Sequence, residues 1–253
     1  MCSITKRKQY HILNGDSLKD QFPNKINGDI IITRECFVDG DVKGGNLDEL
    51  FTSRANYLSK NYGGTCRDYY NHIVPEFQKM LNIRDNSDIN LWFGGDLFCQ
   101  VNLWFVLNLL KENLSECNLF LIIPEKYFCK GFSLWNESDF LSAIENRLKL
   151  KKVNKLSRLW KYYQNNNIEL LIKTSKDFKN IYPFIYNAID AYIQMIPKNG
   201  RLGRPVESLT NIMIDLNTKD FGHIFKEFNK REKIYGFGDL QVKKIYDSII
   251  KNN

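Results

Sequence analysis

Four short apolar runs mark the first half of the chain, at residues 8–13, 29–33, 88–93 and 118–123. The second of them, DIIIT, is continuous and β-branched rather than alternating, which is typical of a strand buried on both faces of a parallel sheet. Asn-Gly, Gly-Gly and Pro follow the first, third and fourth runs and end them. The pattern therefore predicts four mainly parallel strands.

Helical patterns occupy the intervals, at 17–22, 47–61, 69–81 and 97–111. Pro75 interrupts or restarts the third pattern, because proline cannot continue a helix. The second pattern repeats five side chains at a spacing of three or four residues, namely Leu47, Leu50, Phe51, Arg54 and Leu58. Alternating strands and helices predict an α/β fold: a Rossmann-like, mainly parallel four-stranded sheet flanked by helices.

The pattern changes after Trp135, beyond which no convincing strand run is found apart from a possible short hairpin near Tyr235. Helices are predicted at 140–165 (one or two), 177–196, 205–216, 221–230 and 239–250. The last three surround a Gly-containing turn, which favours a helix-turn-helix-like module within 200–253. We therefore expect an α/β domain at 1–130 and a mostly helical C-terminal region at 131–253.

The amino-acid composition excludes several classes of protein. Apolar residues make up 43% of the 253 positions and aromatic residues 13%, which excludes a mainly disordered chain. The six cysteines form no CxxC pair and only three histidines occur, so no zinc-ligand pattern is visible. The first residues lack the apolar core of a signal peptide, and the apolar stretch 101–110 is too short to span a bilayer. We expect a cytoplasmic protein without a membrane partner, with reduced and mostly buried thiols.

The formal net charge is +7, from 36 Lys and Arg against 29 Asp and Glu. That excess favours an anionic partner, such as a nucleotide, a phosphorylated small molecule or nucleic acid. The alternative is a compositional bias toward Lys, Asn and Ile, which would give the same balance without any anionic partner.

Three segments carry a family resemblance: HILNGDSL at 11–18, LWFGGDLFCQVNLW at 91–104 and GRLGRPVE at 200–207. Together they resemble the bacterial family catalogued as domain of unknown function 1835, and the tail resembles its companion, domain of unknown function 3658. In that pattern an Asn-Gly-Asp-Ser turn follows the first strand, and an aromatic strand leads to Asp-x-x-x-Gln-x-Asn on a helix. The resemblance implies the domain layout and the choice of site residues, and it gives no reaction.

Polar residues follow three of the predicted strands. The carboxyl ends of parallel strands meet at one edge of a sheet, where α/β proteins bind ligands. Asn14, Asp16, Glu35, Asp96 and Gln100 are therefore expected to converge within about 10 Å. The catalytic candidates are Asp16, Glu35 and Asp96, and the ligand-binding candidates are Asn14, Gly15, Ser17, Gly95 and Gln100. Carboxylates in this number would also suit Mg²⁺-assisted phosphoryl transfer.

Each candidate also has a structural interpretation. Asp16, Ser17 or Asp96 would cap a helix, and Gln100 would be a buried amide that bonds a neighbouring loop. Glu35 would pair at the surface with an arginine: Arg34, Arg54 or Arg67. His11 is expected to be a satisfied core residue rather than a base, and the aromatic cluster Trp92, Phe93, Phe98, Trp104 and Phe105 is expected to be core. On the helical wheel, Asn102 and Asn108 are expected to lie away from the site.

Basic residues crowd 147–161, with no acid among them. On one helix, Arg147, Lys151, Lys155 and Arg158 would share a face, which is either solvated or grips nucleic-acid phosphates. No Walker A loop, GxGxxG or GxSxG motif occurs. The favoured function is therefore binding of, or action on, a phosphorylated small molecule or nucleotide. The alternative is a regulatory nucleic-acid-binding protein, and whether the protein is an enzyme stays open.

Overall fold

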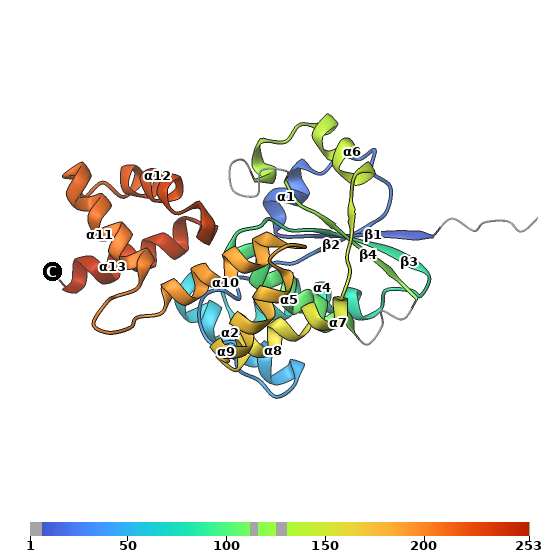
Figure 1. Ribbon diagram of the computed structural model, residues 1–253, viewed down its shortest axis with the longest axis horizontal. Coiled ribbons are helices and arrows are strands. Elements are labelled where there is room, and N and C mark those ends of the chain that lie inside the picture. The colour runs from blue at the N-terminus through green and yellow to red at the C-terminus, as the bar shows by residue number, and fades with distance from the viewer. Residues whose placement is uncertain (1–6, 112–115, 125–130, 253) are drawn as a thin grey trace, which may run out of the picture. The chain divides into compact units, whose positions relative to one another are not determined.

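The computed structural model describes residues 7–111, 116–124 and 131–252 (Figure 1). It consists of two compact units. The first comprises the chain up to Gly94 together with Cys99–Asn167, and the second comprises Gly95–Phe98 and Ile168–Asn253. The predicted domain boundary at 130/131 falls inside the first unit.

The first unit contains a five-stranded sheet in the order β2-β1-β3-β4-β5. Its strands are β1 (Lys8–Leu13), β2 (Asp29–Ile32), β3 (Ser87–Trp92), β4 (Asn118–Ile122) and β5 (Leu148–Lys149). The first four pair in parallel, as in the register Ile12 opposite Ile31 and Leu91. The α/β class and the four parallel strands are thus confirmed. β5 was not predicted, and it is antiparallel to β4.

Helices cover both faces of this sheet. Figure 1 shows α1 and α6 on one face, and α2, α4 and α5 on the other. The helices are α1 (Asp16–Gln21), α2 (Leu47–Tyr62), α3 (Cys66–His72), α4 (Val74–Leu81), α5 (Leu97–Leu110), α6 (Glu137–Glu145), α7 (Val153–Leu156) and α8 (Arg158–Gln164), with a 3₁₀ turn, η2 (Phe132–Leu134). A capping box between Thr65 and Asp68 starts α3. Pro75 lies in the first turn of α4, so it restarts the helix there, as one of the two predicted outcomes.

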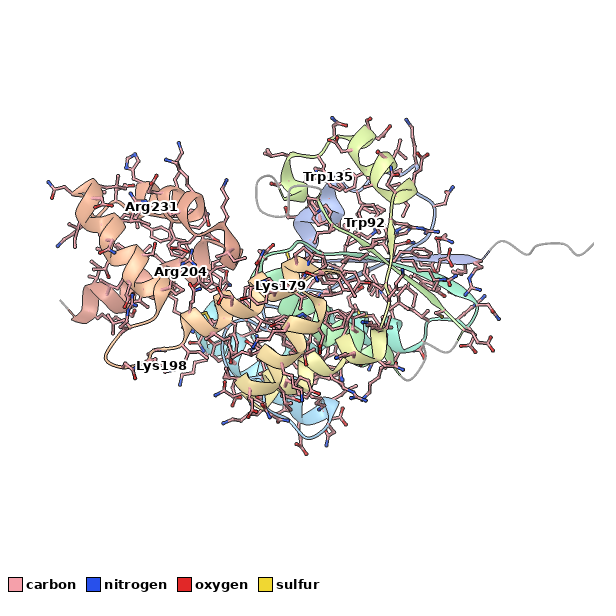
Figure 2. All side chains as sticks on the ribbon, in the orientation of Figure 1. Trp92, Trp135, Lys179, Lys198, Arg204 and Arg231 are labelled. Atoms are coloured by element: carbon pink, nitrogen blue, oxygen red, sulfur yellow. The ribbon has the colours of Figure 1, made fainter. Side chains whose placement is uncertain are left out.

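Aromatic side chains form the core on each face. On the α1 and α6 side, Trp92 packs edge-on against Phe22 at 5.0 Å between ring centroids, and Trp135 packs against the same cluster (Figure 2). On the other side, the ring centroids of Phe37 and Phe105 lie 4.5 Å apart. The expected aromatic core is confirmed for Trp92, Phe93, Trp104 and Phe105, whereas Phe98 is half-buried.

The prediction of helix throughout 147–161 is wrong. Arg147 and the β5 residues precede two short helices, and Lys151 lies between β5 and α7. Leu148, expected to supply an apolar contact, is exposed. Arg147, Lys151, Lys155 and Arg158 therefore do not share a helix face. The physical reason is that Leu150 N donates to Leu119 O at 2.8 Å, which extends the sheet edge past β5.

The second unit is helical apart from one isolated bridge, among the residues described. It contains α9 (Ile168–Phe178), α10 (Pro183–Met195), α11 (Arg204–Leu216), α12 (Phe221–Arg231), the 3₁₀ turn η3 (Lys233–Tyr235) and α13 (Asp239–Asn252). The prediction of a hairpin near Tyr235 is wrong, because that residue ends the 3₁₀ turn η3. α11, α12 and α13 contact one another, and the helix-turn-helix-like character of 200–253 stays a prediction.

Two further expectations can be compared with the structure. In the part of the chain that is described, no helix combines the length and the apolar character that crossing a bilayer requires. Among the described residues, Cys36, Cys66, Cys99 and Cys117 form no disulfide bond, and all four are partly exposed rather than mostly buried as expected. Cys2 and Cys129 lie outside the described residues.

Candidate functional site

The order of the strands reverses direction between β1 and β3. From β1 the chain crosses to β2 on one side, and from β3 it crosses to β4 on the other. In sheets of this kind the ligand crevice lies at the carboxyl ends of the two central strands. Here Asn14 N donates to Trp92 O at 3.3 Å, so the residues after β1 and β3 are adjacent. We call the residues that follow β1, β2 and β3 the rim.

Asn102 links two parts of the rim. This side chain is fully buried in α5, and its Nδ2 donates to Asn14 Oδ1 at 2.9 Å and to Glu35 O at 2.7 Å. Its Oδ1 accepts from Phe37 N at 3.3 Å. The expectation that Asn102 lies away from the site is therefore wrong. It brings Asn14 and Glu35 into one hydrogen-bonded network.

Glu35 does not pair at the surface. Its carboxylate is buried against Arg54 of α2, with Nε to Oε1 at 3.0 Å and Nη2 to Oε2 at 2.8 Å. Tyr69 OH donates to Oε1 at 2.8 Å, and Cys36 N donates to Oε2 at 2.8 Å. Burial disfavours the charge of Arg54, but Glu35 outweighs this effect and raises the pKa of Arg54. The carboxylate proposed as a catalyst is thus occupied by structural donors.

Arg54 also holds the loop after β2. Its Nη1 donates to Asp39 O at 2.7 Å and Asp41 O at 3.1 Å, and its Nη2 donates to Cys36 O at 3.1 Å. Arg54 was one of the three arginines expected to pair with Glu35, and this pairing is confirmed, although it is buried rather than at the surface. The contacts of Arg54 with the loop were not predicted, although Arg54 was one of the five side chains repeated in the apolar pattern of α2. A charged residue on an apolar helix face signals a buried ion pair.

A second cluster of donors surrounds Asp39. Tyr57 OH donates to Asp39 Oδ2 at 2.7 Å, and Tyr62 OH donates to the same oxygen. Burial and the neighbouring Asp39 raise the pKa of Tyr57. Burial, reinforced by the charge of Glu35, raises the pKa of the Cys36 thiol to about 11. Tyr57 and Cys36 therefore stay protonated at neutral pH, and the Tyr57 hydroxyl acts as a hydrogen-bond donor rather than a base.

Asp16 pairs with Arg34, and it does not cap α1. Arg34 Nε lies 2.9 Å from Oδ1 and 2.8 Å from Oδ2 of Asp16. The hydrogen bond that Arg34 donates to Asp16 is the main reason that the pKa of Arg34 is raised. The N-cap of α1 is Gly15, with φ of 96° and no side-chain bond, so the capping interpretation is wrong for Asp16 and Ser17. Ser17 is exposed beside them.

Two buried polar atoms at the rim have no partner among the described residues. Gln100 is fully buried, and its Nε2 donates to Gly94 O at 2.7 Å, which confirms the interpretation of a buried amide on a neighbouring loop. Its Oε1 is unpaired. Thr33 Oγ1 is also unpaired, although Thr33 N donates to Leu13 O at 2.8 Å. An unsatisfied buried polar group costs about 1–3 kcal/mol.

Gly95 and Asp96 belong to the second compact unit. There, a Cβ atom placed on Gly236 would overlap Asp96 Oδ1, so the carboxyl group of Asp96 lies against the Gly-Phe-Gly turn. The convergence of Asp96 with the rim residues stays a prediction. Of the five side chains expected to converge, Asn14 is joined through Asn102 to the backbone of Glu35, whereas the carboxylate of Glu35 is held by Arg54. Asp16 bonds Arg34, and Gln100 bonds Gly94 O.

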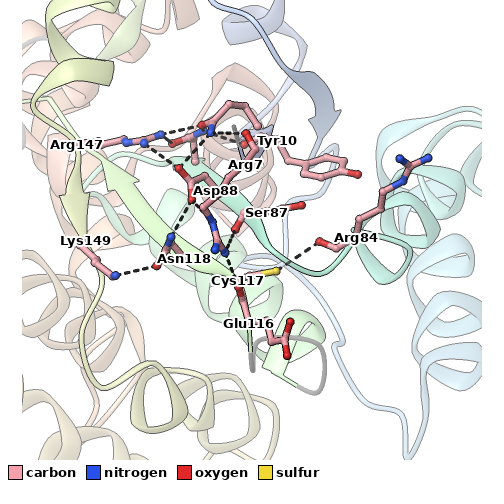
Figure 3. Close-up of polar contacts among 12 residues, drawn as sticks. Arg7, Tyr10, Arg84, Ser87, Asp88, Glu116, Cys117, Asn118, Arg147 and Lys149 are labelled. Carbon is pink, nitrogen blue, oxygen red and sulfur yellow. Dashed lines mark hydrogen bonds and ion pairs between the residues drawn. The ribbon is translucent and has the colours of Figure 1, made fainter. Parts of the chain in front are cut away.

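A separate polar network lies at the amino ends of β1, β3 and β4 (Figure 3). Asp88 accepts from four donors, which are Arg7 Nε at 2.9 Å, Asn118 Nδ2 at 2.9 Å, Arg147 Nη2 at 3.0 Å and Gln9 Nε2 at 3.1 Å. These bonds lower the pKa of Asp88 although its partial burial opposes the charge. Arg147 therefore points inward, and it is not part of a free basic face.

His11 is a satisfied core residue, as expected. Its Nδ1 accepts from Trp92 Nε1 at 3.1 Å, and its Nε2 lies 3.2 Å from Asn27 O. Nε2 must therefore carry the proton. Burial lowers the pKa of His11 to about 4, so the ring is neutral at physiological pH.

Several cavities surround the sheet. One of about 430 Å³ lies at the carboxyl end of β4 and is lined by Pro124, Trp135, Ser142 and Arg147 among others. Another, of about 340 Å³, lies at the amino end of the same strand. Among the described residues, no three His, Cys, Asp or Glu side chains are grouped closely enough to hold a metal ion.

No protein-family model matches the chain, and a search of curated proteins finds no significant similarity. The resemblance to the two domains of unknown function stays a prediction.

Proposed function

We propose that the protein binds a phosphorylated small molecule or nucleotide at the rim between β1 and β3. The unpaired Oε1 of Gln100 carries this proposal. Its amide is held by Gly94 O, so the free oxygen is a fixed hydrogen-bond acceptor. A sugar hydroxyl or a base amino group would donate to it, and this would offset the cost of an unpaired buried acceptor.

Two other rim groups suit the rest of such a ligand. Thr33 Oγ1 is a second unpaired polar atom. Arg34 is partly exposed and always charged, and its planar guanidinium matches a phosphate group bidentately. In the absence of a ligand, the carboxylate of Asp16 is bound to Arg34. A phosphate group would therefore have to replace that carboxylate. We propose binding rather than turnover, because Glu35 and Asp16 are both engaged by arginines.

The test is calorimetric titration with ATP, AMP, NAD⁺ and ribose 5-phosphate, after a thermal-shift screen. Arg34→Gln is expected to weaken binding about tenfold or more, because a charged hydrogen bond contributes about 1.5–3 kcal/mol. Arg201→Gln, which removes an exposed arginine of the second unit, is the matched control and should bind as the wild type does. Equal affinity of the wild type and Arg34→Gln, or no binding by the wild type, would contradict the proposal.

A further inference from the structure

A polar cavity of about 340 Å³ lies at the amino end of β4, whereas the rim lies at the carboxyl ends of the strands. Asn118 is the first residue of β4, and the connection from β5 to α7 faces it, because β5 runs antiparallel to β4. The lining residues are Cys117, Asn118, Leu119, Lys149, Leu150, Lys152, Val153 and Asn154. All of them belong to the first unit.

The two lysines that line this cavity have no carboxylate partner among the described residues. Lys149 Nζ bonds a neutral group, Asn118 Oδ1, at 2.8 Å (Figure 3), and Lys152 forms no ion pair with a described residue. The nearby Asp88 is fully used by its four donors, and Glu116 accepts from Asn86 at 3.0 Å. Among the described residues, neither lysine of the cavity is therefore bound to a carboxylate.

Lys152 also has an unusual backbone. Its φ of 57° and ψ of 36° place it in the left-handed region. For a residue with a Cβ this conformation costs about 1–2 kcal/mol, and such residues gather at ligand-binding positions. Glycine would adopt it without strain. A lysine at this position therefore lowers the stability of the fold and adds a cation to the cavity.

We infer that this cavity binds a phosphate group. The ammonium groups of Lys149 and Lys152 supply point charges of the kind that bind phosphate, and the amide of Asn154 supplies a neutral donor. The volume lies within the range of small-molecule sites, so the phosphate enters together with the group that bears it. The site is separate from the rim and does not depend on the proposed function.

The experiment is calorimetric titration with inorganic phosphate, ribose 5-phosphate and a short single-stranded DNA oligonucleotide. The double variant Lys149→Gln/Lys152→Gln is expected to bind at least one of these probes about tenfold more weakly than the wild type. A double variant at two exposed lysines, Lys60→Gln/Lys173→Gln, has the same change of net charge and should bind normally. Arg34→Gln should also leave this binding unchanged.

The probe that loses affinity identifies the source of the phosphate. A loss confined to the small probes indicates a phosphorylated small molecule, and a loss for the oligonucleotide indicates a nucleic-acid strand. Lys152→Gly provides an independent variant, because it should raise the melting temperature while it weakens binding. Equal affinities in the wild type and the Lys149→Gln/Lys152→Gln variant, or no binding of any probe by the wild type, would overturn the inference.

Discussion

The side-chain amide of Asn102 donates to the side-chain oxygen of Asn14 at 2.9 Å. The same buried amide bonds the backbone on both sides of Cys36, through Glu35 O at 2.7 Å and Phe37 N at 3.3 Å. One residue of α5 therefore fixes the loop after β1 against the loop after β2. The geometry of the rim depends on a side chain that a ligand does not need to touch.

Replacement of Asn102 by leucine should lower the free energy of unfolding by about 3 kcal/mol, because it leaves several buried groups unpaired. Asn108→Leu is the matched control on the same helix, since Asn108 makes a single bond of 3.2 Å to Ser157 O and is half-buried. It should cost about 1 kcal/mol. Urea unfolding measures both. Similar losses for the two variants would show that the Asn102 network contributes little.

The misplacement of Asn102 has a physical origin. The direction of a helical side chain can be inferred from sequence when the helix has a polar and an apolar face. α5 reads LFCQVNLWFVLNLL and is apolar on all sides, so its wheel gives no reference direction. Gln100 could be placed near the rim because it follows Gly94-Gly95 closely. Asn102 could not, because its contacts come from loops distant in sequence.

The strands show the same difference between features that the local sequence predicts and features that depend on distant contacts. Short apolar runs identified β1 to β4, and the run of β2 is continuous, as burial on both faces of a parallel sheet requires. β5 has two residues, both exposed, and it pairs with β4 only through tertiary contacts. Its neighbour Arg147 seemed part of a basic helix, whereas the carboxylate of Asp88 draws it inward. Single-sequence patterns do not contain such long-range electrostatic contacts.

The buried pair of Glu35 and Arg54 yields a second prediction. Arg54→Met should lower the free energy of unfolding by about 3–5 kcal/mol, because it leaves a buried carboxylate without its cation. Glu35→Gln in the same chain should recover part of this loss, since the uncompensated charge is removed. Chemical denaturation of the single and double variants measures the difference.

The exposed pair of Arg201 and Glu207 supplies the control for this prediction. The Arg201 side chain is 77% exposed, and surface ion pairs contribute about 0–1 kcal/mol. Arg201→Met should therefore leave stability nearly unchanged. If Arg54→Met cost no more than Arg201→Met, the pair would not hold the loop after β2 in the way described.

His11 predicts a dependence of stability on pH. Its pKa is about 4 in the folded chain, mainly because of burial, and about 6.5 in an unfolded chain. The neutral ring therefore contributes about 3 kcal/mol above pH 6.5, and this contribution is lost as the pH falls from 6.5 through 4. His11→Gln does not titrate, so its stability should fall less than that of the wild type between pH 7 and pH 4.5. Parallel pH profiles from guanidinium unfolding would contradict this prediction.

Gly236 supplies the last prediction, which concerns its contact with Asp96. Gly236 has φ of 64°, and a Cβ there would overlap Asp96 Oδ1, so Gly236→Ala adds a steric clash to the strain of a positive φ. With ψ of 21°, Gly236 lies in the left-handed helical region, where the strain alone costs about 1–2 kcal/mol. Gly236→Ala should cost about 1–2 kcal/mol more. Asp96→Ala should recover that excess in the double variant, because it removes the clashing carboxylate. If the double variant recovered nothing in thermal unfolding, Gly236 would be required only for its backbone conformation.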